Sequence, residues 1–371
     1  MKILYIITGL GEGGAERITS ELADQMLIYG HAVKIVYLKG DIVIRPKSND
    51  IEIIYLGLDK LVNFFKAFQN YKKLLHEFEP DVVHAHMVHA NIFARICRNF
   101  MPIPRLICSA HSSNEGGWLR MIAYKLTHRL AEVTTNVSQS ASNKFEEVGA
   151  VPSGKIITVY NGIDLTKFEK KNDNDKLRNE LGINVDIPVF LAIGRFDEAK
   201  DYSNLLHAFS IFKETLTFKE KQPALLIAGD GELRPELENL IFTLNLQSDV
   251  ILLGRRDDIP ALLNMADFFV LSSKYEGLPT VVIEAMACET YVIATDCGGS
   301  AEIMGKTGKL IPIQNSIALS NAIHEVLKLS QASILNNNLL ARKRVENKFS
   351  LKSSTERWIE LYESQKNYNY R

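Results

Sequence analysis

The chain has 371 residues, more than one hydrophobic core usually serves, so we expect two domains. Hydrophobic residues make up 46% of the sequence and charged residues 23%, a composition typical of a folded globular protein and not of a disordered one. The formal net charge of -1 argues against a protein that binds nucleic acid through overall basicity.

The cysteines and the N-terminal residues indicate a reducing compartment. Cys97, Cys108, Cys288 and Cys297 have no metal-type spacing and are too few for a disulfide scaffold. The apolar run 3–7 has the length of a strand rather than of a signal-peptide core. No apolar stretch approaches the ~20 residues that span a bilayer. We therefore expect a cytoplasmic protein whose membrane association, if it has any, is peripheral.

The first half of the chain alternates short β-branched runs with amphipathic helical stretches, the rhythm of a parallel α/β sheet. The predicted strands are 3–7, 33–38, 51–56, 81–85, 105–109, 133–137 and 156–159. A polar stretch at 167–186 then predicts a linker with a short helix.

The same rhythm restarts in the second half. The predicted strands there are 189–193, 224–228, 250–253, 268–271 and 291–294. The residues from Ser350 on predict a helix that contains Trp358 and Leu361. We expect two doubly wound, Rossmann-like domains over 1–164 and 165–349, with the helix of 350–371 packing back on the first domain.

A glycine-rich turn follows the first strand. Gly9-Leu10-Gly11-Glu12-Gly13-Gly14 fits the pattern G-x-G-x-x-G and precedes a predicted helix, so its amides would face a phosphate. A dinucleotide site also needs an acidic residue at the end of the second strand, and here Asp41 arrives late. The alternative is that these glycines only permit a tight turn from strand to helix.

Two glutamates mark the second half. Glu276 follows a predicted strand, where open α/β sheets bind ligands, and Glu284 lies about a turn and a half into a helix that begins near Pro279. Carboxylates accept hydrogen bonds from the paired hydroxyls of a ribose or hexose, and the amides of Gly277 and Leu278 suit phosphate oxygens. The alternative is a pair of ordinary surface and helix-cap carboxylates.

With this glutamate pair, separated by seven residues, the sequence resembles glycosyltransferase family 4. That resemblance implies the GT-B fold, in which two Rossmann-like domains face each other across a cleft. Further motifs carry it over nearly the whole chain: 161–164, 193–196 followed by 200–201, 228–231, 253–255 and 295–299. Several ordered motifs at suitable separations are more specific than one glycine fingerprint.

The resemblance also implies roles for particular residues. Arg195 and Lys200 would neutralise the diphosphate as it becomes the leaving group. Glu284 would hold the nucleotide ribose and Glu276 the donor sugar, with Glu276 also counted among the catalytic residues. The other predicted donor-binding residues are Gly13 and Gly14 from the first domain and Gly254, Arg255, Gly277, Leu278 and Thr280 from the second, with the first two of these five near the nucleobase.

Histidines supply the remaining catalytic candidate. His111 follows the strand 105–109, where the resembling family places a histidine beside the donor sugar; the alternative is a partly buried histidine bonded to backbone. His84, His86 and His89 invite a metal site, which we discount because no acidic or cysteine ligand is fixed nearby and the family needs no metal. An acidic triplet at 173–175 resembles the metal motif of the other glycosyltransferase fold but lies in the polar linker.

Basic and aromatic residues gather in the first half. Lysines and arginines outnumber acids between 60 and 129, and the segment 118–126 mixes large apolar groups with cations. This pattern suits peripheral contact with the inner face of the cytoplasmic membrane, where a lipid-linked or lipopolysaccharide acceptor would lie. A core helix with solvated lysines is the alternative.

The sequence thus predicts a retaining glycosyltransferase that needs neither a cofactor nor a metal. Its donor would be a nucleoside diphosphate sugar, UDP favoured, carrying a hexose or N-acetylhexosamine, and its acceptor a surface glycan such as O-antigen or a lipid-linked glycan. No nucleic-acid motif accompanies the basic residues. A nucleotide-sugar epimerase of the same fold, a dinucleotide oxidoreductase and a non-catalytic sugar-binding protein are the alternatives.

Overall fold

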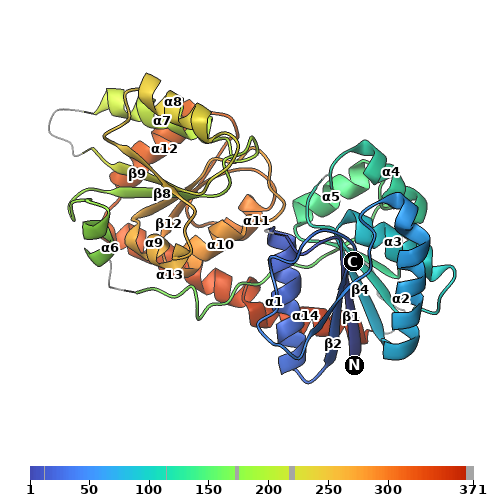
Figure 1. Cartoon of the computed structure of the whole chain (residues 1–371). Coiled ribbons are helices and arrows are strands. Elements are labelled where there is room, and N and C mark those ends of the chain that lie inside the picture. Colours follow the sequence, from blue (N-terminus) through green and yellow to red (C-terminus); the bar gives the residue numbers. More distant parts are fainter. Residues whose placement is uncertain (12, 114, 172–174, 217–221, 365–371) are drawn as a thin grey trace. The chain divides into compact units, whose positions relative to one another are not determined.

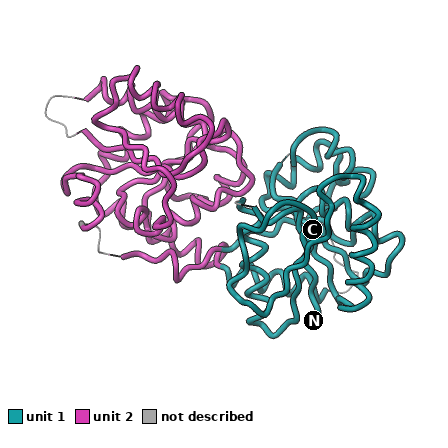
Figure 2. The backbone as a smooth tube through the Cα atoms, in the orientation of Figure 1, with its two compact units in different colours: residues 1–162, 351–371 teal, residues 163–350 magenta. Residues whose placement is uncertain are grey.

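The computed structural model describes residues 1–11, 13–113, 115–171, 175–216 and 222–364, which form two compact units (Figure 2). Unit 1 comprises residues 1–162 and the segment from 351 on, and unit 2 comprises residues 163–350. The boundaries predicted from the sequence are 164 and 349.

Unit 1 is built on a seven-stranded sheet in which all neighbouring strands are parallel (Figure 1). Its order is β3-β2-β1-β4-β5-β6-β7, so the direction of winding reverses between β1 and β4. The strands are β1 (Lys2–Ile7), β2 (Ala32–Tyr37), β3 (Glu52–Tyr55), β4 (Val82–His86), β5 (Leu106–Ser109), β6 (Val133–Asn136) and β7 (Ile157–Thr158). The helices are α1 (Gly14–Ile28), η1 (Leu61–Asn63), α2 (Phe64–Phe78), α3 (Val88–Arg98), α4 (Trp118–Thr127), η2 (His128–Leu130), α5 (Gln139–Glu147) and α14 (Leu351–Glu363).

Helices cover both faces of this sheet, so its central strands are apolar on both sides. In β1, Ile3, Tyr5 and Ile7 pack against α1 and α14. The alternate residues Leu4 and Ile6 point to the other face and pack against α2 and α3. This double burial explains why the sequence shows continuous apolar runs rather than alternation.

The C-terminal helix α14 belongs to unit 1. Its Trp358 is buried, and its Tyr362 hydroxyl lies 3.1 Å from that of Tyr5 on β1. Arg105, at the start of β5, donates to the backbone oxygen of Leu361 at 2.7 Å. The chain thus returns from unit 2 to complete the core of unit 1.

Unit 2 has a six-stranded parallel sheet of order β10-β9-β8-β11-β12-β13, and its winding reverses between β8 and β11. The strands are β8 (Val189–Ile193), β9 (Ala224–Ala228), β10 (Val250–Gly254), β11 (Phe268–Leu271), β12 (Tyr291–Thr295) and β13 (Lys309–Ile311). The helices are α6 (Asp175–Glu180), α7 (Tyr202–Thr215), α8 (Arg234–Thr243), α9 (Ile259–Met265), α10 (Thr280–Ala287), α11 (Ser300–Met304), α12 (Ser316–Leu327) and α13 (Gln331–Lys348).

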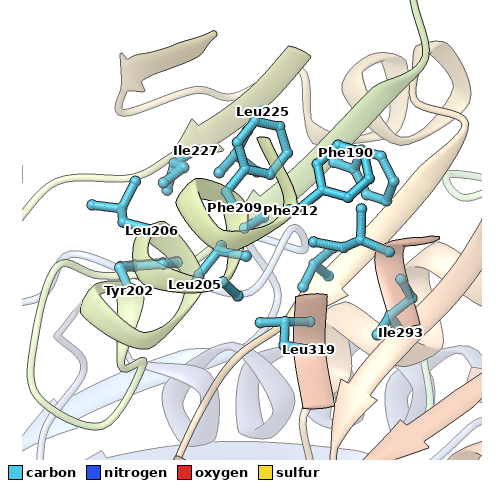
Figure 3. Close-up of a cluster of buried hydrophobic side chains, with 14 of the residues drawn as sticks. Phe190, Tyr202, Leu205, Leu206, Phe209, Phe212, Leu225, Ile227, Ile293 and Leu319 are labelled. Carbon is cyan, nitrogen blue, oxygen red and sulfur yellow. The ribbon is translucent and has the colours of Figure 1, made fainter. Parts of the chain in front are cut away.

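One side of the unit 2 sheet forms an aromatic core against α7 and α12 (Figure 3). Phe190 of β8 stacks on Phe268 of β11 with ring centroids 4.8 Å apart, and Phe209 and Phe212 of α7 are fully buried beside it. Each such side chain contributes about 1.5–3 kcal/mol by leaving water. This core fixes β8 and β11 as neighbours, and the loops that follow these two strands therefore lie together.

Candidate active site

The predicted Lys200 and Glu276 meet at the point where the unit 2 sheet reverses its winding. Lys200 comes from the loop after β8 and Glu276 from the loop after β11, and the carboxyl ends of parallel strands at such a point are where open α/β sheets bind ligands. Lys200 Nζ lies 2.6 Å from Glu276 Oε1, and both side chains are largely buried. Ser273 donates its hydroxyl to the same oxygen at 2.8 Å. A cation, a carboxylate and a hydroxyl thus converge on one spot.

Backbone contacts fix the two loops that carry this cluster. The amide of Lys274 donates to the backbone oxygen of Ala199 at 2.8 Å, and the hydroxyl of Ser272 donates to that of Lys200 at 2.8 Å. Gly194 makes room for the Lys200 stem, because a Cβ on it would lie 2.7 Å from Lys200 Cε. The position of Lys200 is therefore set by the fold rather than by its own flexible chain.

Glycines also join the loops after β8 and β9. A Cβ on Gly229 would overlap the backbone oxygen of Gly194, and one on Gly231 would lie 2.8 Å from the backbone nitrogen of Phe196. Between these loops the amide of Phe196 donates to the backbone oxygen of Asp230 at 3.0 Å. The residues at 228–231, matched to the family by sequence, thus support the turn that carries Arg195.

Arg195 differs from Lys200 in its surroundings. Its side chain is 84% exposed and lies 3.4 Å from Asp197, a partner on the same loop. An arginine held this loosely is free to follow an anion, whereas Lys200 is already fixed.

The remaining predicted donor-binding residues of unit 2 follow β10 and β11. Glu284 is almost fully buried on α10, the helix that starts at Thr280. The backbone oxygen of Gly277 accepts from the amide of Gly299, and Leu278 is buried. Gly254 ends β10 with a positive φ of 68°, and its oxygen accepts from Gly229; Arg255 next to it is exposed. These residues lie at the end of β10, in the loops that follow β10 and β11 and on the helix α10, and binding of a nucleotide ribose by Glu284 stays a prediction.

In unit 1 the predicted His111 lies in a cluster of histidines at the carboxyl ends of β4 and β5. His86 Nδ1, on β4, is 3.0 Å from His111 Nε2. The rings of His84 and His86 are 3.9 Å apart. Burial lowers the pKa of His111 to about 4 and that of His86 well below its usual value, so both rings are neutral at pH 7.

A chain of hydrogen bonds leads from this cluster to the C-terminal helix. His84 Nδ1 is 2.6 Å from the Tyr362 hydroxyl of α14, and His84 Nε2 is 2.6 Å from the Ser109 hydroxyl. Ser109 in turn lies 2.6 Å from Thr135 of β6. His84 is therefore a core histidine whose two ring nitrogens both have partners, consistent with a structural role.

The loop that carries His111 is held by a carboxylate which sequence reasoning missed. The amide of His111 donates to Glu115 Oε1 at 2.7 Å, and Glu115 has a positive φ of 43°. Burial raises the pKa of Glu115. The hydrogen bonds that its carboxylate accepts, foremost the one from the His111 amide, oppose this rise. No sequence pattern marks this residue, since its partner is a backbone amide.

The glycine-rich turn of unit 1 follows β1, beside the winding reversal. Gly13 precedes α1 in an extended conformation and Gly14 begins the helix. The carboxylate of Glu16 occupies the space next to Gly13, since a Cβ on that glycine would collide with it. A carboxylate stabilises a helix N-terminus, as a phosphate would, so a phosphate approaching Gly13 has to displace the Glu16 side chain.

Metal-binding and membrane-spanning features are the last two properties that bear on the site. Among them, no group of three or more His, Cys, Asp and Glu side chains is arranged to hold a metal ion. Asp173 and Asn174 of the acidic triplet lie outside the described residues. No described helix has both the length and the apolarity needed to cross a bilayer.

Helix α4 presents large apolar side chains to solvent. Trp118, Leu119 and Leu126 are 70%, 65% and 78% exposed. Only the opposite side of the helix is buried, through Met121 and Tyr124. The alternative of a core helix with solvated lysines expected the tryptophan to be inside; Trp118 is exposed, although one side of the helix does pack in the core.

Two family models together match most of the chain. "Glycosyltransferase Family 4" matches residues 12–167, and "Glycosyl transferases group 1" matches residues 173–344. The first range covers most of unit 1 without β1 and α14, and the second covers most of unit 2.

Among curated proteins, the chain is 27% identical to UDP-Gal:alpha-D-GlcNAc-diphosphoundecaprenol alpha-1,3-galactosyltransferase of Escherichia coli, over 81% of this chain and 80% of that protein. It is 28% identical to GalNAc-alpha-(1->4)-GalNAc-alpha-(1->3)-diNAcBac-PP-undecaprenol alpha-1,4-N-acetyl-D-galactosaminyltransferase of Campylobacter jejuni, over 99% of each. Among solved structures, Anabaena Alr3699/HepE in complex with UDP superposes with a TM-score of 0.85 and 22% identity, covering 98% of this chain and 100% of that one. The last likeness concerns the fold.

Proposed function

Because the chain belongs to glycosyltransferase family 4 and has the GT-B fold, we propose that it transfers a hexose or N-acetylhexosamine from a UDP-sugar with retention of the α configuration. The proposed acceptor is a lipid-linked glycan, as in assembly of an O-antigen or a similar surface polysaccharide. Two relatives named above act on undecaprenol-diphosphate-linked glycans, and a neighbour of the same fold binds UDP.

The observation that carries this proposal is the cluster of Lys200, Glu276 and Ser273 at the winding reversal of unit 2. A departing nucleoside diphosphate gains negative charge at its leaving oxygen, so a fixed ammonium lowers the energy of the transition state more than that of the ground state. The carboxylate beside it is an acceptor for sugar hydroxyls.

We further propose that the protein's own cations serve the diphosphate and that no metal is required. Lys200 is held in place, and the exposed side chain of Arg195 would supply a second positive charge from the same loop. The proposed retention, with departure and attack on the same face of the sugar, is supported by the family to which the chain belongs. The neutral His111 would donate a hydrogen bond to a hydroxyl group of the sugar that is transferred.

The direct test incubates the purified chain with UDP-glucose, UDP-galactose, UDP-GlcNAc and UDP-GalNAc, each with a diphosphoundecaprenol-linked sugar and with EDTA. We expect one donor to give an α-linked disaccharide-lipid and UDP. A β-linked product would contradict retention, and conversion of the donor sugar without an acceptor would indicate the epimerase instead.

A matched pair of variants links that activity to the cluster. Glu276→Gln keeps the side-chain shape and removes the charge, and we expect a loss of transfer of about 10- to 100-fold. Asp249→Asn is the control, because Asp249 is also a buried carboxylate that pairs with a lysine of unit 2, Lys213, at 2.7 Å. Equal losses in the two variants would refute the role given to Glu276.

The exposed side of α4 supports peripheral binding to the membrane that holds such an acceptor. Trp118 and Leu126 project from it beside the exposed cations Arg120, Lys125 and Arg129. Apolar groups enter the headgroup boundary while cations attract anionic lipids.

The membrane proposal is tested by co-sedimentation with vesicles of phosphatidylglycerol and phosphatidylethanolamine. Replacing Trp118 and Leu126 by Ser removes two apolar anchors, and we expect binding to fall at least tenfold. Phe242→Ser is the control, since Phe242 of α8 is 69% exposed on unit 2. Unchanged binding of the double variant would contradict a membrane surface on α4.

A further inference from the structure

His86 has no assigned role, yet it is the residue that contacts the predicted catalytic His111. It ends β4 and is fully buried. The next residue, Met87, has a φ of 70°, which is rare for a bulky side chain and persists only where the surroundings impose it. The backbone is therefore strained just where the imidazole of His86 is set in place.

The position of one proton decides which of the two rings donates the hydrogen bond in this contact. His86 Nδ1 and His111 Nε2 are 3.0 Å apart, so one nitrogen donates and the other accepts. Burial lowers the pKa of both rings, so each ring carries a single proton. The bond therefore fixes which nitrogen of each ring holds that proton.

The other nitrogen of His86 resolves the choice. His86 Nε2 is buried and has no hydrogen-bond partner among the described residues. If His111 donated, His86 would have to carry its proton on Nε2, which would leave a buried N–H without an acceptor. If His86 donates from Nδ1, only a lone pair is left unmatched, which is the less costly and more common situation.

We infer that His86 is a positioning residue that donates Nδ1–H to His111 Nε2 and thereby holds His111 in the tautomer whose proton is on Nδ1. His111 then offers Nδ1–H as a donor for a sugar hydroxyl and cannot offer Nε2. This inference rests on the proposed function only for the identity of the group that receives this hydrogen bond.

The test uses two substitutions of nearly equal shape. The amide nitrogen of Asn stands close to where Nδ1 stands in histidine, so His86→Asn keeps the donor; His86→Leu fills similar space without one. His89→Asn is the control, because His89 is exposed on α3.

Nitrogen NMR of the histidine-labelled protein at pH 7.5 reports the tautomer without any substrate. We expect His111 to be protonated on Nδ1 in the parent, in His86→Asn and in His89→Asn, and to gain protonation on Nε2 in His86→Leu. Finding Nε2–H on His111 in the parent would overturn the inference, whatever reaction the chain catalyses.

Kinetics supply the second readout. With the active donor and acceptor, we expect kcat to fall about tenfold in His86→Leu, the effect of one well-placed hydrogen bond, with KM for the donor changed less. His86→Asn should recover most of kcat. If both variants lose kcat equally while NMR keeps the parent tautomer, His86 is only a packing residue. Failure of every donor would refute the proposed function and leave the NMR result standing.

Discussion

The Lys200 ammonium would stabilise the fold by pairing with Glu276 and stabilise the leaving diphosphate during transfer. Lys200→Met tests both roles, because the Met side chain still fills the space that Gly194 leaves while the charge is removed. Lys200 and Glu276 are 19% and 15% exposed, so the variant leaves a carboxylate in a poorly hydrated place with Ser273 as its remaining partner in the cluster. An uncompensated buried charge of this kind costs about 1–3 kcal/mol of stability. The thermal midpoint of unit 2 should fall accordingly.

The loss of activity has a different origin. A hydrogen bond to a charged group is worth about 1.5–3 kcal/mol, which corresponds to roughly 10- to 150-fold in kcat/KM. The effect should fall mainly on kcat, because the charge on the departing diphosphate grows in the transition state. Transfer is measured by UDP release and donor binding by calorimetry.

The double variant Lys200→Met, Glu276→Gln distinguishes these effects. Removing the carboxylate removes the stranded charge, so stability should recover while transfer stays low. Lys213→Met, which breaks the other lysine–carboxylate pair of unit 2, should reduce stability and leave transfer within about twofold of the parent. A folded Lys200→Met protein with parental kcat/KM would refute the assignment of Lys200 to the diphosphate.

Three other perturbations probe the same architecture. Gly229→Ala places a Cβ against the backbone oxygen of Gly194, which cannot move away. We expect the free energy of unfolding to fall by about 1–3 kcal/mol, the thermal midpoint to fall with it, and UDP binding to weaken. An unchanged midpoint would contradict the close approach of the two loops. Arg195→Ala should weaken UDP binding about tenfold without changing stability, because the side chain is exposed; calorimetry checks this, and unchanged affinity would refute its role. Burial lowers the pKa of His111, His84 and His86 below the value in the unfolded chain. The contribution of these neutral rings to stability is therefore fully present above pH ~6.5 and decreases as the pH falls from there toward 4, by about 1.4 kcal/mol per pH unit for each ring. Unfolding midpoints that stay constant between pH 7.5 and 5 would contradict burial of the rings in the neutral form.

The central strands could be predicted because each is an apolar run buried on both faces. The prediction for 189–193 coincides with β8, and that for 268–271 with β11. The strand β13 was missed: its three residues lie at the sheet edge and include the partly exposed Lys309 and Leu310, so they show neither an apolar run nor alternation. β7 is still shorter and half-buried, yet it was predicted, because the run 156–159 is rich in β-branched residues.

The site divides in the same way. Glu276 could be named from the sequence because it lies in the turn after a predicted strand, and Lys200 through the family resemblance, although their mutual contact needed the strand order of the sheet. The bond between His84 and Tyr362 joins residues 278 positions apart, and no local pattern encodes such a contact. Glu115 could not be found either, because it acts on a backbone amide.

The two predicted cations differ in a way that bears on how a diphosphate would be held. Lys200 already has a carboxylate partner, so an incoming phosphate must share or replace Glu276, and this exchange is favourable only when the phosphate carries more charge than the carboxylate does. Arg195 has no such constraint, because it is exposed and only loosely paired. Arg195 is therefore suited to initial capture of the donor, and Lys200 to stabilising the charge that develops as the bond to the sugar breaks. On the proposed function, the loop after β8 would thus provide both an early and a late interaction with the same leaving group.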